Sequence, residues 1–340
     1  SPATIQSKTS KASYEAVILG SKLVKCDFIL RLVMALTGVL SCPRIFYKGK
    51  KTLQILATLW HISFAVLYSI ATGLVITFGW RSGTEFELYT SGRLFTYIML
   101  NGYLALSSWS FLILGLLNNG LVRYYQQLAS IEESLWGLRI TPSIKKIKLY
   151  QMIFVGVACC FILCCVAVLL PSFITPDFDR YILGKVINNT NNELETSLLR
   201  VTNRAALLMF SFQWSFGYAY YAHVCTTIWV LGNDFKNEME KAVTTHPANT
   251  LSNLESFRLV HLKISGLIGQ INTLLKWNFS FVFAINGVQL LCALYIASLN
   301  NNYIWISTLI LTGFSLASFV FFCNLVHQVV SRLKGRIPIY

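Results

Sequence analysis

Charged residues are scarce in this chain, and acidic residues are the scarcest. Asp and Glu number 14 against 28 Lys and Arg, and charged residues make up 12% of the 340 positions, whereas hydrophobic residues make up 55%. Soluble domains carry about a quarter charged residues, so this composition argues against an ordinary soluble fold. It does not favour a nucleic-acid partner either, because the basic residues lie between apolar runs and form no basic face.

Six apolar runs contain no Asp, Glu, Lys or Arg. Each is close to or longer than the roughly 20 residues that a helix needs to cross a bilayer. The runs are Ala57–Trp80, Leu94–Leu117, Met152–Leu170, Ala205–Leu231, Phe279–Leu299 and Tyr303–Val330. We therefore expect an all-α, polytopic membrane protein with six transmembrane helices.

The absence of charge inside these runs also narrows the function. Ion-coupled transporters and intramembrane enzymes place titratable groups within their spans, and here the runs hold only His61, His223 and His327. His223 and Cys225 are two residues apart and do not share a helix face. No internal repeat or phosphate-binding loop is present. We expect no enzyme, no cofactor and no metal site.

The basic residues predict the orientation. With a cytosolic N-terminus, 22 of the 28 Lys and Arg fall on the inside and six on the outside. The first 27 residues are too polar for a signal peptide. The outside sequon at Asn188 predicts glycosylation in the loop 171–204. A G-protein-coupled receptor would have the opposite orientation, which disfavours that class.

Cysteines are absent from the predicted outside loops. Although the chain has nine cysteines, four of them, Cys159, Cys160, Cys164 and Cys165, lie in the third apolar run. We expect no structural disulfide. These four side chains are expected to pack between helices.

The apolar runs divide the chain into five segments. Residues 1–56 form a cytosolic segment with a short interfacial or re-entrant helix near 27–43. Residues 57–231 hold spans one to four, with the loop 171–204 as an irregular extracellular cap. Residues 232–278 form a cytosolic anchor, 279–330 hold spans five and six, and 331–340 form a basic cytosolic end.

An amphipathic helix is expected over Asn253–Trp277, within the cytosolic anchor. Phe257, Val260, Ile264 and Leu267 recur at helical spacing, and Lys263 falls between them. We expect this helix to project from the membrane and to pack against helices of its own or of a neighbouring subunit. A helix lying on the lipid surface is the alternative.

Aromatic residues crowd the fourth run. Phe210, Gln213, Trp214 and Gly217 share one helix face, and Tyr218 follows. Rings, one amide and a glycine gap are typical of a pocket for a small organic ligand. Plain helix packing is the alternative, and the sequence leaves both open.

Two C-terminal stretches resemble insect gustatory receptors, a family of ligand-gated cation channels related to insect odorant receptors. Leu259–Ser298 is similar to the family's cytosolic helix with an Ile-Asn step, here Ile271-Asn272, followed by a span that ends in Leu-Tyr, here Leu294-Tyr295. Asn301–Val326 resembles the family's sixth span. The Thr-Tyr and Gln-Phe pattern of a seventh, pore-lining span is absent from this sequence.

The resemblance implies a homotetrameric or heterotetrameric, nonselective cation channel in the plasma membrane of sensory neurons. A small-molecule tastant would open it, and monovalent and divalent cations would pass. By position, Tyr97, Gln213, Trp214, Tyr218 and Tyr295 are the candidates for the ligand pocket. The alternatives are an odorant-receptor-type subunit that needs a coreceptor, and a small-molecule transporter or membrane scaffold. Whether the ligand is a sugar or a bitter compound stays open.

Overall fold

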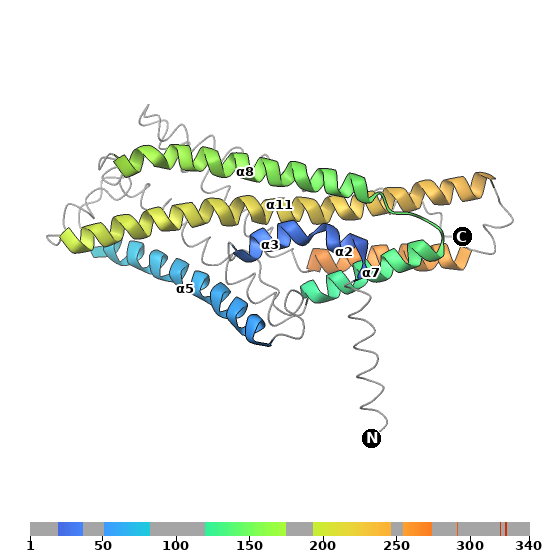
Figure 1. Cartoon of the computed structure of the whole chain (residues 1–340), viewed down its shortest axis with the longest axis horizontal. Helices are drawn as coiled ribbons and strands as arrows, with labels where there is room; N and C mark the ends of the chain where they lie inside the picture. Colours follow the sequence, from blue (N-terminus) through green and yellow to red (C-terminus); the bar gives the residue numbers. More distant parts are fainter. Residues whose placement is uncertain are drawn as a thin grey trace, which may run out of the picture.

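The structure is a computed structural model that describes residues 20–36, 51–81, 120–174, 193–245 and 254–273, with the single positions 291, 320 and 324. Every element in these ranges is an α-helix (Figure 1). The all-α fold class is therefore confirmed. The second predicted span, and nearly all of the fifth and sixth, lie outside the described residues.

Two long helices form the centre of the molecule. α8 (Ile144–Ile174) has 31 residues and α11 (Glu193–Thr245) has 53. At 1.5 Å per residue, α11 is about 80 Å long. The two helices lie side by side and run in opposite directions (Figure 1). α8 buries Ile147, Gln151, Ala158 and Ile162, which recur at helical spacing on one face.

The outer face of α8 is apolar and exposed. Leu149, Met152 and Leu163 are 60%, 61% and 67% exposed. Residues Ile144–Leu163 make up the single helical stretch, among the described residues, that is long and apolar enough to cross a membrane. One such helix also occurs as the core of soluble proteins, but only 22% of this stretch is buried. The many-span topology predicted from the sequence is not shown.

The helices extend further than the sequence predicted. α5 (Lys51–Arg81) covers the first predicted span, while α8 and α11 cover the third and fourth. The loop 171–204 was expected to be irregular, but residues 171–174 and 193–204 are helical. That prediction was wrong for these positions. Pro171 and the charged residues 193–204 were interpreted as loop signals, but Pro171 lies inside α8 and residues 193–204 lie inside α11.

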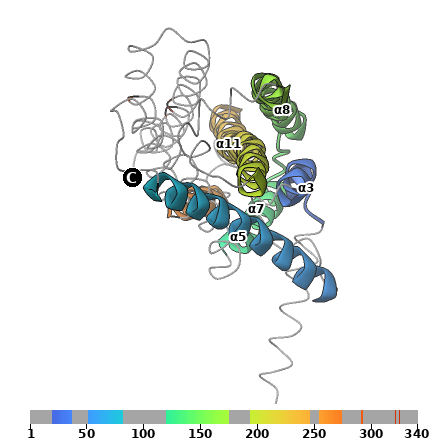
Figure 2. The same ribbon diagram turned by 90° about the vertical axis from the view of Figure 1, so that its left-hand side faces the viewer.

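The N-terminal helices pack one face against the core and leave the other exposed, with Phe28 and Ile29 each 54% exposed. α2 (Lys22–Cys26) and α3 (Phe28–Leu36) pack on α7, α8 and α11. Viewed end-on, α3 lies beside α11, while α5 crosses below α11 at an angle (Figure 2). Leu23 and Leu30 are fully buried. The sequence predicted a helix near 27–43 but missed α2, which falls in a stretch judged too polar.

Two amphipathic helices complete the core. α7 (Gly120–Gly137) buries Tyr124, Leu128, Ile131 and Leu135 along one face. The helix 254–273 buries the predicted stripe Phe257, Val260, Ile264, Leu267 and Ile271. Its amphipathic character is therefore confirmed for 254–273. It packs within this chain: Phe257 contacts the Phe235 ring of α11 at 6.0 Å between centroids.

The connection from α7 to α8 is a tight helix end. Ile140 N–H donates to the Leu135 carbonyl at 2.8 Å, and Arg139 N–H donates to the Trp136 carbonyl at 2.9 Å. Arg139 has a φ of 61°, the left-handed conformation that glycine usually provides at this position. Ile140 and Leu135 are both buried, which adds the hydrophobic contact typical of such an end.

Candidate functional site

The predicted ligand pocket falls largely outside the described residues. Tyr97, Tyr295 and the sequon residue Asn188 are among the positions that the structure does not describe. Gln213, Trp214 and Tyr218 lie in α11, where the helical backbone assumed for them is present, but their side chains are not described. The pocket therefore stays a prediction.

A buried polar junction lies where the N-terminal helices meet α11. Asp27 occupies the break between α2 and α3, and its Oδ1 contacts Nε2 of His223 in α11. Asp27 is 1% exposed and His223 is 0% exposed. A carboxylate and an imidazole in direct contact, away from water, can hold a proton between them. Among the described residues, this is the one contact between an acidic and a basic side chain in which both are buried.

Glu132 holds the start of α2 against α7. Its carboxylate accepts hydrogen bonds from Ser21 Oγ at 2.5 Å, Lys22 N–H at 3.2 Å and Leu23 N–H at 3.1 Å. Ser21 Oγ in turn accepts from Val24 N–H at 3.1 Å. The first N–H groups of a helix have no partner within the helix, so the carboxylate and the hydroxyl satisfy them. By holding Ser21 and the first residues of α2, Glu132 also positions Asp27, which lies six residues after Ser21 at the end of α2.

Neutral polar side chains occur near the pair along the chain. The Tyr125 and Tyr220 hydroxyls are 2.9 Å apart, joining α7 to α11 one turn from His223. Burial raises the pKa of the Cys26 thiol to about 11; Lys148 lowers it, while Asp27 and Glu132 raise it further. Cys26 therefore stays protonated near neutral pH. The junction combines the Asp27–His223 pair with the Glu132 carboxylate, two tyrosine hydroxyls and a protonated thiol.

Sequence reasoning missed this junction because it considered the spans alone. His223 was treated as an isolated histidine, and the six runs contain no carboxylate. The structure corrects this picture, since Asp27 comes from outside the runs and is 196 positions away in the chain. One signal was present: Asp27 is the only acidic residue between Glu15 and Glu85. A single acid in a long apolar and basic stretch needs a partner when it is buried.

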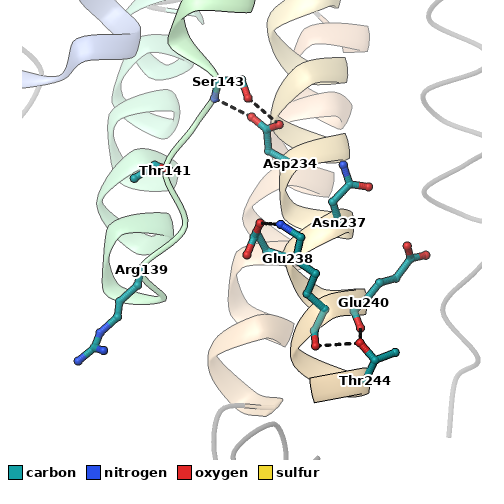
Figure 3. A pocket seen from close by; sticks show the side chains of 9 residues that line it. Arg139, Thr141, Ser143, Asp234, Asn237, Glu238, Glu240 and Thr244 are labelled. Atoms are coloured by element: carbon teal, nitrogen blue, oxygen red, sulfur yellow. Dashed lines mark hydrogen bonds and ion pairs between the residues drawn. The ribbon is translucent and has the colours of Figure 1, made fainter. Parts of the chain in front are cut away.

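A second polar site is a cleft at the C-terminal end of α11. It encloses about 680 Å³ between α11 and the connection that precedes α8 (Figure 3). Asp234 points toward Ser143, whereas Arg139 points away from the carboxylates (Figure 3). The lining residues are Arg139, Thr141, Ser143, Asp234, Asn237, Glu238, Glu240, Lys241 and Thr244.

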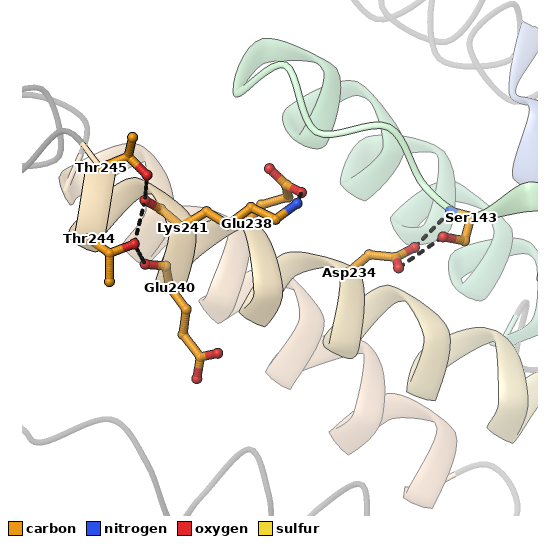
Figure 4. Close-up of polar contacts among 7 residues, drawn as sticks. All are labelled: Ser143, Asp234, Glu238, Glu240, Lys241, Thr244 and Thr245. Carbon is orange, nitrogen blue, oxygen red and sulfur yellow. Dashed lines mark hydrogen bonds and ion pairs between the residues drawn. The ribbon is translucent and has the colours of Figure 1, made fainter.

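The acidic groups of this cleft have partners in the chain. Asp234 accepts from Ser143 N–H at 2.7 Å and from Ser143 Oγ at 3.0 Å, at the start of α8 (Figure 4). Glu238 contacts Lys241 Nζ at 2.5 Å, and Glu240 lies 3.5 Å from Lys236. Thr244 Oγ1 donates to the Glu240 carbonyl at 3.0 Å (Figure 4). Asp234 therefore caps the start of α8, and the other two acids pair with lysines on α11 itself.

No group of three metal-ligating side chains occurs within the ranges that the structure describes. Neither protein-family models nor curated proteins match this chain. The resemblance to insect gustatory receptors therefore stays a prediction.

Proposed function

We propose that this chain is a multi-pass subunit of a nonselective cation channel that a small organic tastant opens, at the plasma membrane of sensory neurons. The observation that supports it best is the helix 254–273. Its buried stripe packs on α7 and α11, while Leu259 and Leu262, on the opposite face, are 48% and 52% exposed. Exposed leucines on a helix that is already anchored, beside the exposed Glu255–Arg258 ion pair, fit contact with another subunit through a mixed apolar and charged face.

Two glycines on the same exposed face support assembly. Gly266 and Gly269 are exposed, and no neighbouring atom lies within 4 Å of the position that a Cβ would take. A glycine inside a helix costs about 1 kcal/mol relative to alanine. Close approach of a second helix offsets that cost, because the missing side chains let two backbones come together.

Matched substitutions at Gly266 test the assembly. Gly266→Trp should block close approach and shift the protein from tetramers to monomers, whereas Gly266→Ala should preserve the tetramer and stabilise the helix. Subunit photobleaching or light scattering in mild detergent measures both. If the tryptophan variant assembles as well as the alanine variant, this face is not an interface.

The membrane assignment is supported by the exposed apolar faces of α5 and α8. Cys159 and Cys160 on α8 are free and exposed, so they do not pack between helices of this chain as the sequence predicted. If α8 crosses a bilayer, a charged thiol reagent should not label them in vesicles, although it should label them in denaturant. Labelling in intact vesicles would contradict the proposed span.

Whole-cell recording tests the channel function. The full coding sequence that includes residues 1–340 would be expressed in cells that lack such receptors, alone and with candidate coreceptors. Sugars and bitter compounds should evoke cation currents. The outcome that abandons the proposal is confirmed surface protein with no current for any compound or partner. Current only with a coreceptor would favour the odorant-receptor type.

One observation favours a transporter as the second candidate. The low count of titratable groups in the apolar runs argued against ion coupling, but Asp27 and His223 form a buried carboxylate–imidazole pair. Proton-coupled carriers use such pairs. Uptake of a labelled substrate that depends on a proton gradient, without conductance, would support this candidate.

A further inference from the structure

Asp27 and His223 meet where α2 ends and α3 begins. Asp27 ends α2 and precedes α3, so a change at its carboxylate acts on both short helices. His223 lies far from either end of α11. Their contact is the one ion pair, among the described residues, whose two members are both buried.

We propose that Asp27 and His223 form a proton-binding site that controls the docking of α2 and α3 on α11. With one imidazolium and one carboxylate, the pair is neutral and its charges compensate each other. Adding a proton to Asp27 leaves a buried imidazolium, and removing one from His223 leaves a buried carboxylate. Either change leaves one uncompensated charge, which weakens docking.

The groups around Cys26, the neighbour of Asp27 in the chain, include charges of both signs and neutral hydroxyls. Glu132 from α7 and Lys148 from α8 act on the neighbouring Cys26 with opposite signs. Tyr124, Tyr125 and Tyr220 contribute buried hydroxyls, and Cys26 a protonated thiol. Asp27 Oδ2 and His223 Nδ1 are both buried without a hydrogen-bond partner among the described contacts. Among the described contacts, each side chain therefore has the other as its one hydrogen-bonding partner.

The fraction of molecules in which α2 and α3 are docked on α11 should therefore be largest at an intermediate pH and fall on either side of it. Losing or gaining one proton changes the docking equilibrium by at most about tenfold per pH unit. Under the proposed channel function, on which this one consequence rests, protons on the inner side would modulate gating. The proton site itself does not depend on conduction.

Hydrogen exchange of the purified protein in nanodiscs tests the site without any current. Exchange would be followed across pH 5–9 and corrected for intrinsic rates, in peptides that cover 22–36 and, as the internal control, 254–273. The expected result is that protection of 22–36 falls about tenfold or more at one or both ends of this range, while 254–273 changes little. Equal pH profiles for the two regions would overturn the proposal.

Two variants separate a proton site from a merely structural contact. The double variant D27N/H223Q keeps two polar partners that do not titrate, so α2 and α3 should stay docked but lose the pH dependence. The swapped variant D27H/H223D should restore it. If D27N/H223Q keeps the pH profile of the original protein, the proposal is overturned. If D27N/H223Q does not fold, the proposal is overturned when hydrogen exchange of 22–36 in D27H/H223D does not depend on pH.

Discussion

Polar side chains are buried in the middle of α11 and exposed in its C-terminal third. In the middle, His223, Thr226 and Thr227 are buried, and His223 contacts the buried Asp27. In the C-terminal third, Glu238 and Lys241 are 43% and 69% exposed and pair with each other three residues apart. Burial decides the difference: water can replace the exposed contacts but not the buried ones. The buried middle should therefore determine how the helices fit together.

Removing Asp27 should have the largest effect. Asp27→Ala leaves His223 buried without its partner, and breaking a buried pair costs about 3–5 kcal/mol. Thermal unfolding in detergent would show a large fall in Tm. Asp27→Asn, which retains a polar partner, should lose less. Equal losses for the two variants would show that charge is not what the site requires.

High pH should also weaken the buried middle, through Cys26. Its pKa is about 11 when folded against an ordinary value of 9.0, so the folded protein keeps a proton that the unfolded chain releases. Stability is intact below about pH 9 and falls by on the order of 3 kcal/mol as the pH rises to about 11. Cys26→Ala should lack this loss. Unfolding curves at pH 8 to 11 provide the measurement.

Glu132 tests the start of α2. Glu132→Ala removes the acceptor for three hydrogen-bond donors and should cost about 2 kcal/mol, since buried donors left unpaired cost about 1–3 kcal/mol. Chemical denaturation in detergent would measure it. Glu133→Ala, one position along α7 and exposed, is the matched control and should have little effect. Similar costs at the two positions would contradict the capping role.

The half-exposed end of α11 should tolerate more. Asp234→Ala removes the carboxylate that accepts from Ser143 and should cost about 1 kcal/mol, the usual value for a lost helix cap. Asp234→Asn should recover most of it. A loss as large as that of Asp27→Ala would erase the contrast between the two regions of α11.

Lys241 should matter least. Its contact with Glu238 is exposed, and pairs of this kind contribute about 0.2–1 kcal/mol. Lys241→Gln should therefore change the free energy of unfolding by less than about 0.5 kcal/mol, with the difference disappearing in high salt. A larger change would mean that the cleft depends on this pair for its shape.

The local patterns predicted the helices well and their ends poorly. The stripe from Phe257 to Ile271 and the run in α8 follow directly from apolar spacing. The start of α11 was missed because charged residues, from Glu193 to Arg204, were interpreted as loop, although they fit a helix equally well.

The polar junction was beyond local patterns. Asp27 and Glu132 gain their roles from residues more than 100 positions away, and no periodicity links such positions. The solitary position of Asp27 indicated only that a partner was needed. Which residue serves as the partner depends on how α2 and α3 pack on α11.

The unbroken course of α11 has a mechanical consequence. A helix bends sharply at proline or where its ladder of hydrogen bonds is interrupted, and Glu193–Thr245 contains no proline. α11 therefore runs as one helix over the roughly 30 Å that separate Trp214 from Asp234, so these positions belong to a single element. His223 lies between these two positions, so the contact with Asp27 ties this stretch of α11 to α2 and α3.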